Sequence, residues 1–251
     1  MGEVIKLESV SNEIALISME DKEAKNTFSS QFITGINDCF ETVAKNKKYK
    51  VVVLKGYDNY FACGGTKEEL LKVHHQEMDF NELSFYRSAL DCPIPVIAAM
   101  QGHGIGGGFV FGLYADICVL GIENIYTTNF MNYGFTPGVG ATYVVPYKLG
   151  QALGHEMLFT GKNYRGNELK DRGVPYEVVT KKEVVSKSIE IAESLAEKPR
   201  ISLMTLKESC TKTLKKNLDT TIKKELKMHD ITFTQPEVKK KIEEVFSQYE
   251  K

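Results

Sequence analysis

Neither sign of charge is in excess in this sequence of 251 residues. It has 32 lysines and arginines against 33 aspartates and glutamates, so the formal net charge is −1. Without a positive field over the surface, binding to a nucleic-acid backbone or to an anionic membrane is not expected. We therefore predict neither nucleic acid nor membrane as a partner.

Cysteines are few and show no pairing along the sequence. There are five, an odd number, and no two of them form a Cys-x-x-Cys motif. The pattern indicates neither a disulfide framework nor a thiolate zinc site, so we expect no metal and a reducing compartment. The cysteines are Cys39, Cys63, Cys92, Cys118 and Cys210.

Long apolar runs are also missing. No stretch approaches the roughly 18 apolar residues of a membrane-spanning helix, and the N-terminal sequence MGEVIKLESV has charges where a signal peptide has its apolar core. We expect a soluble, cytoplasmic protein. Hydrophobic residues make up 42% of the chain, which is enough for one large buried core and excludes an intrinsically disordered protein.

Short apolar runs alternate with helical patterns in the first part of the chain. Between the apolar runs at residues 13–19 and 50–54, residues 29–46 have apolar side chains at helical spacing. Two further strand-like runs cover residues 95–100 and 115–120. This alternation predicts an α/β fold with a largely parallel sheet.

After about Pro146 the pattern changes to helices, apart from one short apolar stretch at residues 174–179. No composition break, Ser/Gly linker or internal repeat separates this part from the first. We therefore expect one continuous unit. The helices are expected at residues 151–159, 182–196, 202–214 and 219–229.

Two glycine clusters give the strongest functional signal. The first lies in FACGGT at residues 61–66, and the second is GHGIGGG at residues 102–108. Each follows a predicted strand and precedes a predicted helix, where glycines let the backbone approach a ligand and the helix N-terminus presents N–H groups to negative charge. Together they could form a two-donor oxyanion hole; separately, each could be only a tight turn.

The second cluster also contains a G-x-G-x-x-G pattern, formed by Gly102, Gly104 and Gly107. In a dinucleotide-binding fold this motif follows the strand that opens the domain, whereas here other predicted strands come earlier. No P-loop lysine follows the glycines. The pattern alone is therefore a weak argument for a nucleotide site.

Five motifs in order along the chain are YFACGG (60–65), PVIAAMQGHGIGGG (95–108), ADICV (115–119), YGFTPGVG (133–140) and FTGKNYRGNELKDRGVP (159–175). Their order resembles the crotonase, or enoyl-CoA hydratase/isomerase, superfamily over essentially the whole chain. The resemblance implies an α/β fold with a spiral ββα core at residues 1–195 and a C-terminal helical region at residues 196–251. It also implies homotrimers or dimers of trimers, acyl thioester substrates, and backbone N–H groups of Gly65 and Gly107 that hold the thioester carbonyl while an enolate forms.

Two glutamates that hydratases of this superfamily use as general base and general acid are absent. By resemblance they would stand at Val110 and Phe130. Neither side chain can transfer a proton, so hydration is not expected. An apolar lining instead suits a reaction whose leaving group is already charged, because desolvating a carboxylate promotes loss of CO2 while the enolate is stabilised.

A narrower resemblance rests on GYDNYFACGGT (56–66), AMQGHGIGGGFVFGLYADI (99–117), TTNFMNYGFTPGVGAT (127–142) and KELKMHDITFTQPEV (224–238). These segments resemble the decarboxylating enoyl-hydratase-like enzymes of the β-branching (HMG-synthase) cassette in bacterial trans-acyltransferase polyketide synthases. The resemblance implies decarboxylation of a 3-methylglutaconyl-type thioester on acyl carrier protein to a 3-methylcrotonyl-type thioester, through a dienolate. It implies no cofactor besides the phosphopantetheine or coenzyme A that carries the acyl group.

His229 is the predicted catalytic histidine. It follows Ile222 and Leu226 at i, i+4, i+7 spacing, which places it on an inward helix face. By resemblance, the decarboxylating subgroup has a histidine here that acts with a lysine on the carboxylate or the proton. The alternative is a core histidine with a purely structural role.

The partner lysine is predicted at Lys72. The positions that align with it in the subgroup are near Val73 or Asp79, and neither is a lysine. Lys72 is the nearest substitute and Lys67 the next. Both could also be solvated residues of a KEELLK helix.

Cys63, Val110 and Phe130 are predicted to line the substrate pocket. Cys63 precedes the first glycine pair, but no histidine is placed in the sequence to activate it as a nucleophile. His74 and His75 are adjacent and would face different ways on a helix, which argues against a metal site.

Two rival hypotheses stay open. An enoyl thioester isomerase would use the same oxyanion hole and one proton-shuttling group, and it would turn over a substrate without the distal carboxylate. A non-enzymatic scaffold would bind acyl thioesters or RNA without turnover, although the balanced charge argues against RNA.

Overall fold

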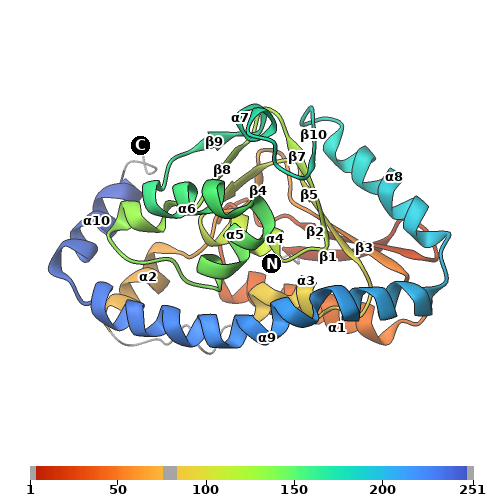
Figure 1. Ribbon diagram of the computed structural model, residues 1–251, viewed down its shortest axis with the longest axis horizontal. Coiled ribbons are helices and arrows are strands. Elements are labelled where there is room, and N and C mark those ends of the chain that lie inside the picture. Colours follow the sequence, from red (N-terminus) through yellow and green to blue (C-terminus); the bar gives the residue numbers. More distant parts are fainter. Residues whose placement is uncertain (1–3, 76–83, 248–251) are drawn as a thin grey trace.

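The computed structural model describes residues 4–75 and 84–247. It contains a six-stranded sheet in the order β1-β2-β3-β5-β7-β10 and a four-stranded sheet in the order β4-β6-β8-β9 (Figure 1). The pair β1/β2 is antiparallel, and the other neighbours in the large sheet are parallel. The predicted α/β fold with a largely parallel sheet is confirmed. The strands are β1 (Ile5–Ser9), β2 (Ile14–Met19), β3 (Val51–Lys55), β4 (Tyr60–Ala62), β5 (Val96–Met100), β6 (His103–Ile105), β7 (Ile117–Gly121), β8 (Ile125–Thr127), β9 (Tyr164–Arg165) and β10 (Glu177–Val179).

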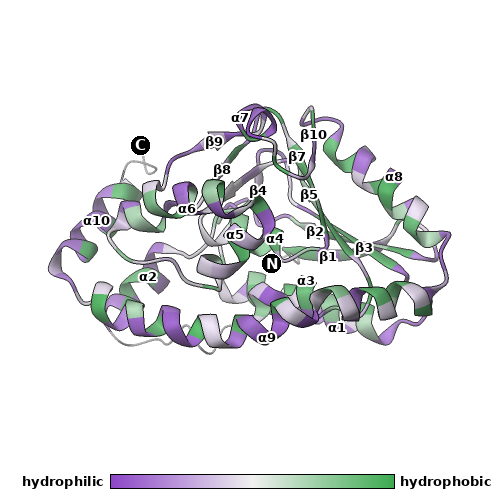
Figure 2. Ribbon diagram, viewed as in Figure 1, coloured by the Kyte–Doolittle hydropathy of each residue, from purple (hydrophilic) through white to green (hydrophobic). Residues whose placement is uncertain are grey.

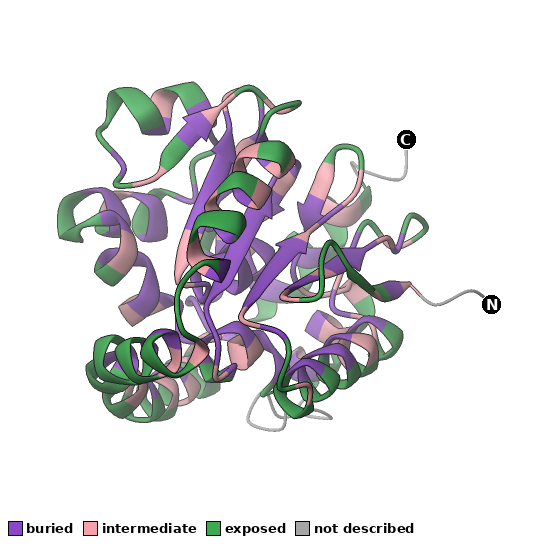
Figure 3. Ribbon diagram, turned by 90° about the vertical axis from the view of Figure 1, so that its right-hand side faces the viewer, coloured by how far each residue is buried: buried purple, intermediate pink, exposed green. Residues whose placement is uncertain are grey.

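Helices cover both faces of the large sheet. In Figure 3 the strands are buried and the helices around them expose their outer sides, and Figure 2 shows the matching apolar strands. The α-helices are α1 (Ser30–Lys45), α2 (Lys67–His74), α3 (Ser88–Asp91), α4 (Gly107–Leu113), α5 (Ala141–Leu149), α6 (Gln151–Thr160), α7 (Gly166–Asp171), α8 (Val184–Ala196), α9 (Arg200–Thr232) and α10 (Pro236–Ser247); the 3-10 helices are η2 (Phe85–Arg87) and η3 (Asn129–Tyr133).

Strand β3 shows why the central strands are apolar throughout. Its side chains alternate between two separate hydrophobic clusters: Val52 and Leu54 belong to the larger cluster, and Val51 and Val53 face the cluster that includes Ala192 of α8. A strand buried on both faces has no solvent side, so polar and apolar residues do not alternate along it. The apolar content of residues 50–54 therefore predicted this strand correctly.

The chain repeats a β-β-α unit, with one strand in each sheet followed by a helix. The units are β3-β4-α2 and β5-β6-α4, and β7-β8 leads into η3 and then α5. Because β4 and β6 are parallel neighbours in the small sheet, the helices that follow them begin side by side. The predicted spiral ββα core is confirmed, and it brings the two glycine clusters together.

Each glycine cluster was predicted to follow a strand of the large sheet directly. Instead, along the chain, the short strands β4 and β6 lie between the large sheet and the helices. Residues 103–105 of the second cluster are themselves strand β6, and the helix begins only at Gly107. A three-residue strand of histidine, glycine and isoleucine has too few apolar residues to be recognised by pattern.

The helices predicted at residues 202–214 and 219–229 are a single helix, α9, of 33 residues. The polar run between them, Lys215 to Asn217, is a solvent-facing turn of that helix and not a break. No glycine or proline interrupts residues 200–232, so nothing in the backbone ends the helix there. In Figure 1, α9 runs along one edge of the molecule beneath α5.

The described part of the predicted C-terminal region, residues 196–251, consists of the end of α8, α9 and α10. Its division from a core at residues 1–195 stays a prediction. Among the helices of the described residues, none combines the length and the apolar composition needed to cross a membrane.

Candidate active site

The two glycine clusters touch each other. Gly64 has φ +74°, and a Cβ atom built on it would lie 3.1 Å from the backbone nitrogen of Gly107. A Cβ on Gly108 would lie 2.1 Å from the carbonyl oxygen of Ala62. Only glycine permits this approach of the end of β4 to the start of α4.

The backbone N–H groups at this junction belong to two helix N-termini. Gly107 is the first residue of α4, so the helix offers its N–H no carbonyl acceptor one turn earlier. Gly65 precedes Thr66, the N-cap of α2, which forms a capping box with Glu69. The capping box fixes the start of α2, and with it the position of Gly65.

Gly65 and Gly107 lie in the wall of one cavity of about 60 Å³. A carbonyl oxygen that reached both N–H groups would be held where negative charge develops on it. The rest of the wall is largely apolar, so water is a weak competitor for these donors. The apolar side chains are Phe28, Leu70, Phe85, Phe130, Phe135 and Val139.

His229 also lines this cavity, from helix α9. It is 7% exposed. Its Nε2 lies 3.0 Å from the carbonyl oxygen of Thr136 and 3.2 Å from that of Pro137. Two carbonyl acceptors require a proton on Nε2. The ring packs on Gly138, where a Cβ would come within 2.5 Å of the imidazole.

Of the three predicted pocket residues, Cys63 and Phe130 are in the cavity wall. Burial raises the pKa of the Cys63 thiol to about 12, so the side chain is a neutral thiol and a poor nucleophile. Val110 is fully buried in α4 and is not in the wall. It belongs to the larger hydrophobic cluster of the core.

Lys72 does not lie at the cavity either. Helix α2 turns Glu69 and Leu70 toward it, and Lys72 pairs at 2.6 Å with Glu68 one turn earlier, with 46% of its side chain exposed. Its position gives the predicted acid role no support. Of the two aligned positions, Val73 is buried in the core and Asp79 lies outside the described residues.

Two carboxylates near the cavity were missed by the sequence reasoning. Glu69 lines it, with Oε2 accepting hydrogen bonds from the N–H and hydroxyl of Thr66. Glu225, one turn before His229, is 1% exposed and lines a smaller adjoining cavity that His229 also borders. The T-x-x-E spacing of a capping box could have indicated the first; a buried glutamate on a lysine-rich helix has no comparable signature.

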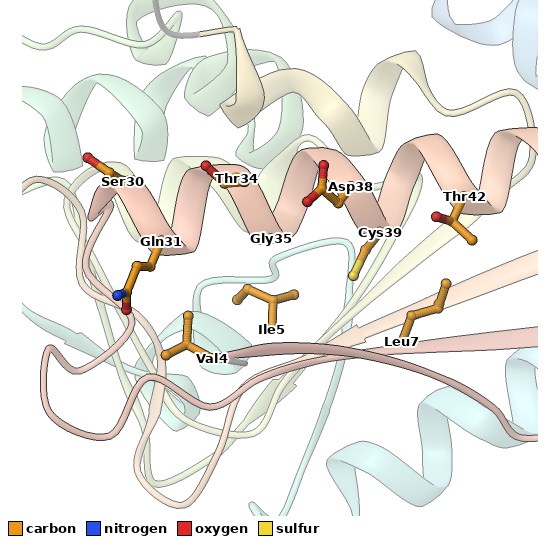
Figure 4. Close-up of a pocket in the computed structure, with 10 residues that line it drawn as sticks. All are labelled: Val4, Ile5, Leu7, Ser30, Gln31, Thr34, Gly35, Asp38, Cys39 and Thr42. Carbon is orange, nitrogen blue, oxygen red and sulfur yellow. The ribbon is translucent and has the colours of Figure 1, made fainter. Parts of the chain in front are cut away.

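A wider hollow of about 560 Å³ lies between β1 and α1 (Figure 4). It shares no residue with the glycine-lined cavity. It is lined by aliphatic side chains of Val4 and β1 and by residues of α1, among which Asp38 is the carboxylate. Because size alone provides no chemistry, the smaller cavity with its convergent donors is the candidate active site.

No group of three or more His, Cys, Asp or Glu side chains in residues 4–75 and 84–247 is arranged to hold a metal ion. His74 instead places its Nδ1 2.6 Å from the carbonyl oxygen of Phe233. This contact joins α2 to the end of α9.

The sequence profile of the enoyl-CoA hydratase/isomerase family matches residues 9–250. The chain belongs to this family. The decarboxylating resemblance is confirmed as well: this family member is 49% identical to the bacillaene synthase decarboxylase PksI of Bacillus subtilis, over 97% of this chain and 98% of the relative.

Solved structures agree with this placement in the family. One comes from a dehydratase/decarboxylase enzyme couple involved in polyketide β-branching, with 50% identity, a TM-score of 0.94, and coverage of 96% of this chain and 95% of the other. The decarboxylase domain of CurF from Lyngbya majuscula is 42% identical, with a TM-score of 0.93 and coverage of 97% and 99%.

Proposed function

We propose that this family member removes CO2 from a 3-methylglutaconyl-type thioester carried by an acyl carrier protein and leaves a 3-methylcrotonyl-type thioester. The observation that carries the proposal is the pair of backbone donors, Gly65 and Gly107, in an apolar cavity with Phe130 at a position where, by resemblance, a hydratase has a glutamate. Two of the similar proteins, the bacillaene synthase decarboxylase and the CurF domain, are decarboxylases, which supports the same chemistry.

The reaction needs an electron sink and one proton. The bond between the distal carboxylate and its neighbouring methylene carbon breaks, CO2 leaves, and the electron pair spreads through the conjugated system to the thioester oxygen. The N–H groups of Gly65 and Gly107 stabilise the charge on that oxygen. One proton added to the carbon that lost CO2 restores a neutral thioester of the 3-methylcrotonyl type. Atoms and charge therefore balance without an oxidant or reductant.

We assign His229 to the carboxylate or the returning proton. Its Nε2–H is held by two backbone carbonyls, so exchange with the substrate would use Nδ1. The apolar wall disfavours the charged carboxylate and favours its departure as CO2. Phe28 and Phe85, whose rings meet edge to face with centroids 4.7 Å apart, belong to this wall.

The carrier and the assembly belong to the same proposal. An acidic carrier protein would be attracted to the exposed lysines of α10, among which Lys241 lies beside Gly134, next to Tyr133 of the cavity wall. A homotrimer or dimer of trimers would bury apolar surface, and Phe159 and Ile201 are 77% and 69% exposed.

The test is intact-protein mass spectrometry of an acyl carrier protein loaded with 3-methylglutaconyl thioester, before and after the enzyme is added. We expect the loss of one CO2 from the carrier, and faster turnover than with the coenzyme A thioester. An unchanged mass with both substrates would contradict the proposal. Turnover only of an enoyl thioester without the distal carboxylate would favour the isomerase.

A further inference from the structure

Glu225 is a buried carboxylate with no part in the chemistry proposed above. Its Oε2 accepts a hydrogen bond of 2.7 Å from the N–H of Gly140. Its Oε1 accepts bonds of 2.8 Å from the N–H and 2.6 Å from the hydroxyl of Thr142. Helix α5 begins between these residues and has no side-chain cap of its own. Glu225 therefore caps α5 from another helix, and its negative charge suits the N-terminus.

The same face of α9 holds the chain just before α5. Glu225, His229 and Thr232 follow each other at i, i+4, i+7 spacing, which aligns them along the helix. Thr232 Oγ1 lies 3.0 Å from the hydroxyl oxygen of Thr136, and His229 binds the carbonyls of residues 136 and 137. The segment from residue 136 to residue 142 is thus attached to α9 at both ends.

Between these attachments the backbone is strained. Val139 has φ +53°, a left-handed conformation that is rare for a β-branched residue. The hydroxyl of Tyr114 donates to the Val139 carbonyl at 2.7 Å. Val139 lines the candidate active site and also the smaller cavity beside Glu225. A strained wall residue keeps this conformation only while the bonds around it hold.

We propose that Glu225 is a positioning residue for the reaction: by holding the N-terminus of α5 against α9, it fixes Val139 in the cavity wall and keeps in place the backbone carbonyls that orient His229. This inference rests on the proposed function, because one of its readouts is turnover. The other readout is the state of the His229 ring, which needs no substrate.

The decisive variant is Glu225→Gln. The amide keeps the shape of the side chain, but its NH2 group would face N–H donors, so at least one bond to α5 is lost. At pH 8, well below the melting temperature, we expect kcat to fall about tenfold and KM to change by less than about twofold. In histidine-labelled protein, we expect the ring 15N signals of His229, assigned with His229→Ala, to shift.

A second variant keeps the test valid should Glu225→Gln fail to fold. Thr142→Val removes only the hydroxyl donor and leaves both backbone donors. We expect a fall in kcat of about two- to threefold and a smaller shift of the same ring signals.

Asp116→Asn is the matched control. Asp116 Oδ2 accepts a bond of 2.7 Å from Lys207, a buried residue of the same helix α9 that does not line the candidate active site. This variant should lower the melting temperature and leave kcat and the His229 signals unchanged. The proposal is overturned if Glu225→Gln, or Thr142→Val in its place, has wild-type kcat and His229 signals, or if Asp116→Asn reproduces their losses. Should the wild type not turn over, the ring signals alone decide the inference.

Discussion

On one side of the candidate active site the substrate would meet backbone, and on the other it would meet side chains. The first side consists of Gly65 and Gly107, brought together by neighbouring strands of the small sheet. The second consists of His229 and the segment that Glu225 holds from α9. The backbone side depends on glycines that let two backbone segments approach closely. The α9 side depends on a network of hydrogen bonds. The two sides should therefore fail in different ways when they are altered.

The largest effect is expected for His229→Ala. His229→Gln separates a catalytic role of the histidine from a purely structural one. Both remove the imidazole that we propose acts on the carboxylate or the returning proton, so we expect kcat to fall on the order of 10³-fold in each. Glutamine can still donate to the carbonyls of Thr136 and Pro137, so it should retain more stability than alanine. The measurements are kcat and melting temperature. Near wild-type turnover in His229→Gln would show that the histidine is a core residue.

The backbone side is tested by Gly65→Pro against Gly65→Ala. Proline removes the N–H donor, and we expect turnover to fall on the order of 10²-fold. Alanine keeps the donor, and its Cβ would lie at an ordinary contact distance of 3.5 Å from Leu70, so most activity should remain. Steady-state kinetics on folded protein check both. Full activity in the proline variant would contradict the proposed role of Gly65 as an oxyanion donor.

The same contrast explains what could be predicted from the sequence. Close approach of two backbones demands glycine, so the side proposed as the oxyanion hole can be recognised in the sequence from the glycines at residues 64–65 and 106–108. The apolar strands of the large sheet can be recognised as well because they are buried on both faces. The ββα spiral itself came from resemblance, since strands β4 and β6 are too short to be recognised alone.

The α9 side was harder to predict, because the buried residues of α9 nearest the site, Glu225 and His229, are polar. His229 was placed on an inward face by its spacing from Ile222 and Leu226, but the more deeply buried neighbour is Glu225. Hydropathy assigns a glutamate to the surface. Only the fold shows that its carboxylate meets the start of α5. The assignment of Lys72 stays a prediction: its place in the KEELLK helix did not indicate which side of α2 faces the cavity, and the structure places Glu69 and Leu70 there.

The two sides should also differ in the pH dependence of stability, because only the α9 side contains a buried carboxyl that titrates. Burial raises the pKa of the Glu225 carboxyl from its ordinary value of 4.5 to about 7, although the hydrogen bonds from Thr142 and Gly140 lower it in part. A group whose pKa is raised by folding stabilises the protein fully below its unfolded pKa, and this contribution is lost as the pH rises through the folded pKa. The buried phenols of Tyr86 and Tyr114 face the same carboxyl, but burial raises their pKa values too, so they stay neutral in this range.

We therefore expect the unfolding free energy of the wild type, relative to Glu225→Gln, to decrease between pH 4.5 and pH 8 by up to roughly 3 kcal/mol. Urea denaturation of both proteins across this range, each in the His229→Gln background so that the neighbouring imidazole does not titrate, measures the difference. Gly65→Ala serves as the control from the backbone side, because it removes no titrating group and its difference from the wild type should not depend on pH. A constant difference for Glu225→Gln as well would mean that the carboxyl titrates alike in the folded and unfolded chains. In that case its bonds to the start of α5 would compensate fully for its burial.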